Sequence, residues 1–453
     1  MWAKIVKIIY FIRRKKIKLT QFYIKSEIKN NEVVFYNTLN EAVLILDAAA
    51  VQQFEDNIDS LNLKEFSEIK NVLIENEFLL DDDIDEEANY MKALLNQHKK
   101  FNHLSVHILP TTACNFNCVY CYQSGIDRHH FLSQDKINDI ISYLENHIKK
   151  HPEIHSATYI LHGGEPTVNW KVVPNILQRL DEMSQLYKIK YRTQIVTNGY
   201  LLTPEKSELL SKYNWQRMQV TIDGPKDIHN SRRLMGSGKD SYSSIINNLK
   251  YIQDNKLIDK ISIRLNFDQS NFGDIVEYLP TLKNIFGTKG IILSLGYISD
   301  TYGNTEAENY ISENILKDEK MIAAYCSLYK KALELGFEMP DLFMLEGMCT
   351  AKLDNAFVIY PNGDVYKCLS GVGRKEFIES TIYKKGELDN YLYPELYKEC
   401  FNKKCCFIPL CNSGCRFNGY LKTGRKNSND CQKELLDNLN KKLLTIKYLI
   451  KGV

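Results

Sequence analysis

The chain has 453 residues, a formal net charge of +2, 44% hydrophobic residues and 25% charged residues. This length exceeds that of one ordinary domain and predicts two or three. The near-neutral charge creates no global field that would attract nucleic acid. The sequence also lacks an uncharged apolar run of about 18 residues, so we expect no membrane span.

The first 18 residues are basic and partly apolar, but they lack the long apolar run and the small-residue cleavage site of a secretory signal. We expect an ordinary basic strand or helix there, with contact to a membrane surface as the alternative. A long chain without such a signal is expected in the cytoplasm, where thiols stay reduced. The 12 cysteines therefore indicate metal ligands or redox groups before disulfides.

Residues 1–100 are expected to form a small strand-and-helix module. The alternating stretches FYIKSEI, EVVFYN and AVLILD predict short strands. Helices are expected around Ala49–Asp56 and Leu63–Asn76. The acidic run from Asp81 to Glu87 indicates a solvated boundary.

From residue 103 onward, strand-like stretches alternate with amphipathic helices. The strand-like stretches are HLSVHIL, ATYIL, TQIVT, MQVTID, ISIRLNF and IILSLGYI. Ser133 and the pair Thr203-Pro204 stand where helices should begin. This α/β alternation over residues 101–335 predicts a parallel sheet curved into a barrel or part of one. Reactive residues in such folds collect in the loops after the strands, and a loop with three cysteines directly follows the first strand.

Residues 336–453 are expected to form a cysteine-rich, loop-rich domain. Eight of the 12 cysteines lie between 349 and 431, and long apolar stretches are few. Bound metal can stabilise such a region. Cys326 is isolated in the sequence, and we expect it to be a lone buried thiol.

The motif Cys114-Asn-Phe-Asn-Cys118-Val-Tyr120-Cys121 places three thiolates in one short loop. Three thiolates can hold three corners of a [4Fe–4S] cluster and leave one iron open for a ligand. The motif resembles the signature C-x3-C-x-aromatic-C of the radical SAM superfamily. The resemblance implies that S-adenosylmethionine binds the open iron and is cleaved reductively to a 5′-deoxyadenosyl radical. A zinc knuckle is the alternative for the three cysteines.

A second match follows the second strand, at Gly163-Gly164-Glu165-Pro166. The resemblance implies that Gly163, Gly164 and Glu165 hold the amino group of S-adenosylmethionine, while the preceding His162 is structural. Further matches follow later strands at Thr197, Asn198, Thr221, Asp223, His229, Arg233, Arg264 and Asn266. These polar groups are expected to contact the ribose and carboxylate of the cosubstrate. Helix capping and turn formation are the alternative for Asn198 and Asp223.

The C-terminal cysteines resemble the SPASM extension of radical SAM enzymes, which holds two auxiliary [4Fe–4S] clusters. By this resemblance the first cluster uses Cys349, Cys368 and Cys415, with the fourth ligand left open. The second uses Cys400, Cys405, Cys411 and Cys431. One departure is Asn402, which stands where the pattern has a cysteine, so that Cys400 or Cys406 is the substitute. Zinc, which also takes four thiolates, is the alternative metal.

The resemblance therefore implies a partial (β/α)6 radical SAM barrel with three [4Fe–4S] clusters and S-adenosylmethionine. Many SPASM enzymes form thioether or carbon–carbon crosslinks in ribosomal peptides, so we expect a peptide maturase with a precursor peptide as substrate. We expect flavodoxin or ferredoxin as electron donor. The N-terminal module is expected to bind a leader peptide along a strand edge, or else merely to cover the barrel.

Two other functions stay open. One is formylglycine formation by a sulfatase-maturase-like enzyme. Such enzymes tend to carry an acidic residue directly after the G-x4-C cysteine, where this chain has Leu369. The other is a non-catalytic metal-binding adaptor, which would not cleave S-adenosylmethionine.

Overall fold

The computed structural model describes residues 17–28, 31–47, 50–51, 67–99, 102–236, 238–299, 307–340, 342–343, 349–384 and 392–451. The basic start of the chain and most of the helix expected over Ala49–Asp56 lie outside these residues. Among the helices of the described ranges, none combines the length and the apolar run that crossing a membrane would need.

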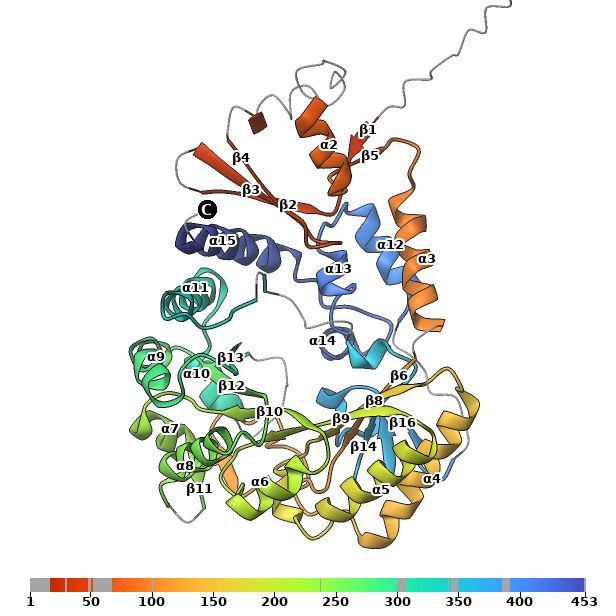
Figure 1. Ribbon diagram of the computed structural model, residues 1–453, viewed down its shortest axis with the longest axis vertical. Coiled ribbons are helices and arrows are strands. Elements are labelled where there is room, and N and C mark those ends of the chain that lie inside the picture. The colour runs from red at the N-terminus through yellow and green to blue at the C-terminus, as the bar shows by residue number, and fades with distance from the viewer. Residues whose placement is uncertain are drawn as a thin grey trace, which may run out of the picture.

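A nine-stranded sheet in the order β13-β12-β10-β9-β8-β6-β14-β15-β16 runs across the lower half of the molecule in the view of Figure 1. Six neighbouring strands of this sheet are parallel. They are β6 (His103–Ile108), β8 (Ser156–Leu161), β9 (Lys190–Thr197), β10 (Trp215–Thr221), β12 (Lys260–Phe267) and β13 (Ile291–Tyr297). All six coincide with predicted strands, and the predicted parallel α/β sheet is confirmed.

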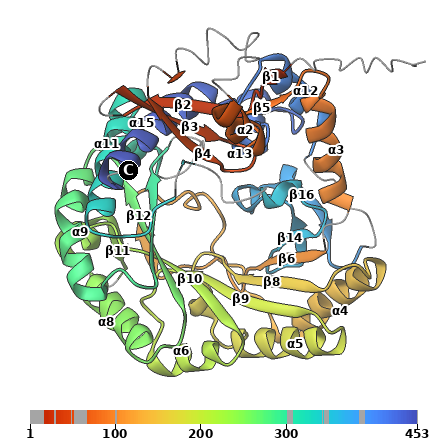
Figure 2. The ribbon, with the colours of Figure 1, turned by 45° about the horizontal axis from the view of Figure 1, so that its top comes forward.

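Helices cover the outer side of the curved sheet (Figure 2). They are α4 (Gln134–Lys150), α5 (Val173–Leu186), α6 (Pro204–Ser211), α8 (Ser241–Asp254), α9 (Phe272–Phe286) and α11 (Asp318–Glu334). In α4 the predicted apolar stripe is buried, and Leu144 is 0% exposed. Burying each such aliphatic side chain contributes about 1.5–3 kcal/mol, which holds the helices on the sheet. Ser133 and Thr203 occupy the expected N-cap positions, although neither side chain makes a capping hydrogen bond.

Three strands beyond residue 336 extend the same sheet. β14 (Ala356–Ile359) pairs in parallel with β6, and β15 (Asp364–Tyr366) and β16 (Ile378–Thr381) follow in antiparallel register. The C-terminal part is therefore continuous with the barrel sheet, whereas the sequence indicated a separate loop-rich unit. Strands of three or four residues are too short to show a periodic pattern.

The rest of the C-terminal part is helical. It contains α12 (Pro394–Asn402), α13 (Ile408–Cys411), α14 (Arg416–Thr423) and the long α15 (Lys433–Lys451). The buried leucines Leu439, Leu443 and Leu444 lie on one face of α15. This helix packs against α11 on one side and β2 on the other, and so connects the barrel to the N-terminal module.

The N-terminal module has the three predicted strands in one antiparallel sheet. Its elements are β1 (Ile17–Leu19), β2 (Tyr23–Glu27), β3 (Glu32–Asn37), β4 (Val43–Asp47), α2 (Ser67–Glu75), β5 (Leu79–Asp81) and α3 (Glu86–Lys99). The acidic run does not separate two modules. It connects β5 to α3, and Glu86 in the first turn of α3 accepts a hydrogen bond of 2.5 Å from Thr20 Oγ1.

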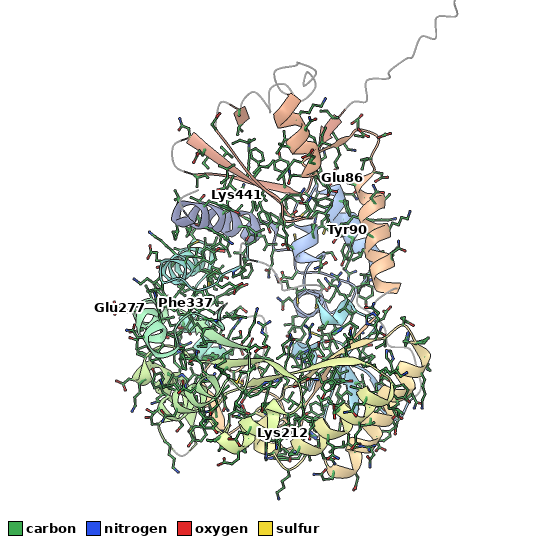
Figure 3. All side chains as sticks on the ribbon, in the orientation of Figure 1. Glu86, Tyr90, Lys212, Glu277, Phe337 and Lys441 are labelled. Atoms are coloured by element: carbon green, nitrogen blue, oxygen red, sulfur yellow. The ribbon has the colours of Figure 1, made fainter. Side chains whose placement is uncertain are left out.

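The module shares a hydrophobic core with the C-terminal part. Phe22 and Tyr90 pack on Phe401 of α12, with ring centroids 6.0 and 5.7 Å apart. Ser26 Oγ of β2 donates to the carbonyl of Lys441 in α15 at 2.9 Å. Figure 3 shows Tyr90 on the side of α3 that faces α12 and α13. Removal of the module would therefore expose apolar side chains of the C-terminal part.

Candidate active site

The three loop cysteines lie beyond the C-terminal end of β6, where the sequence predicted them. Cys118 ends the short strand β7 (Phe116–Cys118), which pairs with β11 (Arg233–Met235) and places Arg233 opposite Cys118. A tight turn follows, in which Cys121 N donates to Cys118 O at 3.1 Å. Local chain geometry thus keeps Cys114, Cys118 and Cys121 in one small region.

Burial, the other thiols of the loop and one cation set the electrostatic environment of Cys114 and Cys118. Burial raises the pKa of Cys114 to about 12, and Glu165, Cys118 and Cys121 add to this effect. Burial raises the pKa of Cys118 to about 11, while the guanidinium of Arg233 lowers it. Three thiols with a buried cation beside them are a suitable donor set for three corners of a cluster. The thiols must be deprotonated to bind iron, and the cation offsets part of the resulting negative charge.

The Gly163-Gly164 pair packs directly against the strand end that precedes Cys114. Gly164 N donates to Thr111 O at 3.2 Å. A Cβ atom on Gly163 would overlap with the same carbonyl, and Gly163 has φ +150°. Only glycine permits this close approach. Pro166 begins the 3-10 turn Pro166–Asn169 that leads away from the site.

Glu165 is wholly buried, with 0% exposure. Its Oε1 accepts hydrogen bonds from Thr167 N at 3.0 Å, Thr167 Oγ1 at 2.5 Å and Thr197 Oγ1 at 2.8 Å. Its Oε2 accepts from Asn198 N at 2.7 Å. Burial raises the pKa of Glu165 and these hydrogen bonds lower it. The carboxylate therefore connects the end of β8 to the end of β9, a role that the sequence did not indicate.

Tyr120 lies at the centre of a buried polar network. Its hydroxyl donates to Asp223 Oδ2 and accepts from Arg233 Nη1 at 3.0 Å and from Asn266 Nδ2 at 3.4 Å. The guanidinium of Arg232 lies 5.0 Å from the centre of the Tyr120 ring. The network connects the cysteine loop to the ends of β10 and β12.

Three further residues of this network were not predicted. Arg232 Nη1 lies 2.9 Å from Asp268 Oδ2, and Tyr310 OH donates to the same oxygen at 3.0 Å. Arg232 Nε lies 3.6 Å from Asp223 Oδ2. Asp268 directly follows β12, so its place after a barrel strand was a usable signal. Nothing in the sequence marks Tyr310, which lies far along the chain in α10 (Glu308–Asn314).

The remaining predicted residues lie at the same edge of the sheet. Asn198 Nδ2 donates to Asn115 Oδ1 of the cysteine loop at 2.8 Å. Arg264 Nε donates to Asn266 Oδ1 at 3.0 Å. Thr221, the last residue of β10, is partly exposed. Asp223 is fully buried, where burial raises its pKa and Arg233 and Arg232 lower it.

The first C-terminal thiol group contains Cys349, Cys368 and Cys415. Burial raises the pKa of Cys368 to about 12, and Cys349 and Cys415 raise it further. Burial also raises the pKa of Cys415, and the Cys349 thiol adds to this effect. These residues lie on three separate segments and act electrostatically on one another, and their role as ligands of one cluster stays a prediction.

The second group contains Cys400, Cys405, Cys411 and Cys431. Burial raises the pKa of Cys400 to about 12, and the thiols of the other three add to this effect. Burial raises the pKa of the extra Cys406, and its neighbour Cys405 and Asp437 add to this effect. The thiol of Cys405 acts on both Cys400 and Cys406, so the choice of substitute ligand stays a prediction. Among the described residues, no three His, Cys, Asp or Glu side chains converge closely enough to hold a single metal ion.

Comparisons with known proteins found a matching family model and several relatives. A family model of the radical SAM superfamily matches residues 108–280. The radical SAM cyclopropyl synthase TigE of Paramaledivibacter caminithermalis is 28% identical over 288 residues, which are 59% of this chain and 57% of that protein. A cysteine-type anaerobic sulfatase-maturating enzyme of Clostridium perfringens is 24% identical over 343 residues, 69% of this chain and 89% of that protein.

The solved structure of native anSMEcpe with bound AdoMet and Kp18Cys peptide has the same fold. Its TM-score is 0.55 at 19% sequence identity, and the match covers 78% of this chain and 100% of that chain. The family match begins at the end of β6 and includes the cysteine loop and the Gly163-Gly164 segment. Residues 108–280 are therefore a radical SAM domain, and the relatives named above include peptide-modifying enzymes with such a domain.

Proposed function

We propose that this protein cleaves S-adenosylmethionine reductively and uses the resulting radical to modify a ribosomally made peptide, by a thioether or carbon–carbon crosslink. One observation carries the proposal. Three neighbouring thiols lie at the carboxyl end of β6, next to a glycine pair that brings the β8 end against them. The related cyclopropyl synthase and sulfatase-maturating enzymes support chemistry of this class.

Within this proposal, Cys114, Cys118 and Cys121 hold a [4Fe–4S] cluster with one open iron. When bound, the cluster supplies one electron for breaking a carbon–sulfur bond of S-adenosylmethionine. The backbone of Gly163 and Gly164 lines the place of the amino group. The polar groups at the ends of β9, β10 and β12 orient the rest of the cosubstrate, and a donor such as flavodoxin or ferredoxin supplies the electron.

The two C-terminal thiol groups hold two auxiliary [4Fe–4S] clusters in this proposal. Cys349, Cys368 and Cys415 serve the first. The second is held by Cys400, Cys405, Cys411 and Cys431. Auxiliary clusters can accept an electron from the substrate after hydrogen abstraction, which suits an oxidative crosslink.

The metal content tests the number of clusters. We expect about 12 iron atoms per chain after anaerobic reconstitution, because the proposal assigns three four-iron clusters to the chain. A variant with alanine at Cys114, Cys118 and Cys121 should lose about a third of this iron and keep the rest. Iron and zinc are measured together by elemental analysis. Stoichiometric zinc with little iron would contradict all three cluster assignments.

The N-terminal module offers a strand edge for the leader of the peptide. Among the described residues, β4 pairs only with β3. Asn37 N donates to Ala42 O at 2.8 Å, and bonded and non-bonded pairs alternate along an antiparallel ladder. Phe35 and Leu44 are therefore a bonded pair, whereas the backbone groups of Ile45 point away from β3. An added strand would use these outward groups.

Ile45→Pro should abolish leader binding and sharply reduce peptide modification. Proline removes the outward N–H while leaving the ladder with β3 intact. Ile45→Ala is the matched control, since it removes the side chain and keeps the N–H. Leader affinity is measured by calorimetry and modification by mass spectrometry. Equal binding by both variants would leave the module only its structural role. Deleting the module is less informative, because its core is shared with α12 and α15.

A second candidate is formylglycine formation, which the likeness to sulfatase-maturating enzymes favours. Leu369 argues against it, because an apolar side chain cannot act as the base that removes a proton from the oxidised residue. Incubation with a cysteine-containing sulfatase peptide distinguishes the two. An aldehyde product, found as a mass loss and by hydrazide capture, would favour this second function.

A further inference from the structure

Among the buried cationic side chains of the C-terminal part, which also include Lys367 and Lys447, two are bound by the loop that joins Cys411 to Cys415. Lys352 is 1% exposed and Arg416 is 3% exposed. Removing an ammonium or guanidinium group from water costs several kcal/mol, unless hydrogen bonds and opposite charge compensate it. The surroundings of these two groups should therefore show what provides the negative charge.

Both cations are held by the loop Cys411-Asn412-Ser413-Gly414-Cys415. Lys352 Nζ donates to the carbonyl of Asn412 and, at 3.0 Å, to that of Gly414. Arg416 Nη1 donates to Ser413 O at 2.8 Å, and Nη2 donates to Ser413 Oγ at 2.7 Å. These carbonyls satisfy donors, but they carry no net charge.

The loop has an unusual backbone conformation. Asn412, Ser413 and Gly414 have φ values of 52°, 59° and 84°, all in the left-handed region. Such a conformation is strained for each residue other than glycine and persists only where the surroundings impose it. Here it directs successive carbonyl groups at two cations. A Cβ atom on Gly414 would lie 2.7 Å from Asp430 O, so the third position requires glycine.

The two ends of this loop belong to different thiol groups. Cys411 is in the second group and Cys415 in the first, while Lys352 N donates to Cys349 O at 2.8 Å. The thiols of Cys349, Cys411 and Cys415 are close enough to act electrostatically on the Lys352 ammonium. Those of Cys349 and Cys415 also act on Arg416. The two cations therefore lie between the two sets of cysteines.

We propose that Lys352 and Arg416 are fixed counter-charges for the two auxiliary clusters and raise the reduction potentials of these clusters. The inference rests on the auxiliary clusters of the proposed function. A cluster held by thiolates is negatively charged and becomes more negative when it takes up one electron. A nearby buried cation favours the reduced form, because the low-dielectric interior screens its charge weakly.

The test uses the full chain with alanine at Cys114, Cys118 and Cys121, so that only the auxiliary clusters remain. In this background Lys352→Met and Arg416→Gln remove the charges, while Lys352→Arg and Arg416→Lys keep them. Lys398→Met is the matched control, since Lys398 is an exposed lysine two residues from Cys400. After anaerobic reconstitution, iron content and the potentials of the reduced-cluster EPR signals are measured by mediated titration.

We expect the charge-removing variants to shift the auxiliary potentials to more negative values, and the charge-keeping variants and Lys398→Met to leave them near the parent value. Unchanged potentials in both charge-removing variants would overturn the inference. If these variants instead lose their iron, retention by Lys352→Arg or Arg416→Lys supports the charge role, and loss in both overturns it. Absence of iron from the parent background would refute the auxiliary clusters themselves.

Discussion

Replacing any one of Cys114, Cys118 and Cys121 by alanine is expected to abolish 5′-deoxyadenosine formation. The three thiols lie in one loop around the turn at Cys118 and influence one another electrostatically. Two remaining thiols would leave the cluster without one of its three protein ligands, so no stable site for S-adenosylmethionine would remain. The product is measured by liquid chromatography after incubation with dithionite under anaerobic conditions.

Two cysteines serve as controls for this experiment. Cys326 lies on α11, away from all three thiol groups, and Cys406 lies beside Asp437. Alanine at either position should leave deoxyadenosine formation close to that of the unaltered chain. Normal deoxyadenosine formation by the Cys114, Cys118 or Cys121 variants would show that the radical site has been misplaced.

Glu165→Ala is expected to lower both the stability of the barrel and its affinity for S-adenosylmethionine. The buried carboxylate accepts four hydrogen bonds from Thr167, Thr197 and Asn198. Alanine would leave these donors unsatisfied, and each buried unsatisfied group costs about 1–3 kcal/mol. We expect the free energy of unfolding to fall by about 3–5 kcal/mol, the range for removing one partner of a buried charged set.

A matched variant separates the two effects of Glu165. Thr197→Val removes one of the four donors and also the acceptor of Gly199 N, and should cost about 1–3 kcal/mol, less than Glu165→Ala. Denaturant unfolding gives the stabilities, and equilibrium binding to the reconstituted chain gives the affinities. A Glu165→Ala protein as stable as the unaltered chain would contradict the structural role. If Glu165→Ala bound S-adenosylmethionine more weakly but were equally stable, the carboxylate would bind the cosubstrate and have no structural role.

Local sequence was sufficient to predict much of the fold and the main motif. The six parallel strands and the stripe Ile137, Ile140, Ile141 and Leu144 of α4 follow from hydrophobic periodicity, which reports which side of an element is buried. The cysteine loop could be identified because its three thiols lie within eight residues. The glycine pair could be identified because it directly follows a strand.

Contacts between distant segments were decided only by the tertiary structure. Periodicity records that a residue is buried, but not which residue it meets, so nothing local predicted that β14 pairs with β6 or that Phe22 packs on Phe401. The same holds for the polar groups. Glu165 resembles a ligand-binding carboxylate in sequence, and its bonds to Thr197 and Asn198 appear only when β8 and β9 lie side by side.

In the cysteine-rich C-terminal part, some features followed from the sequence and others only from the tertiary structure. The spacing of its cysteines indicated metal binding, since thiols placed at short, irregular intervals in a reduced chain have few other uses. The family resemblance already assigned residues 349, 368 and 415 to one group, although local spacing alone does not show that these distant residues lie near one another. The burial of Lys352 against the Cys411–Cys415 loop had no sequence signal, because a lysine that is buried and one that is exposed look alike until the chain around them is folded.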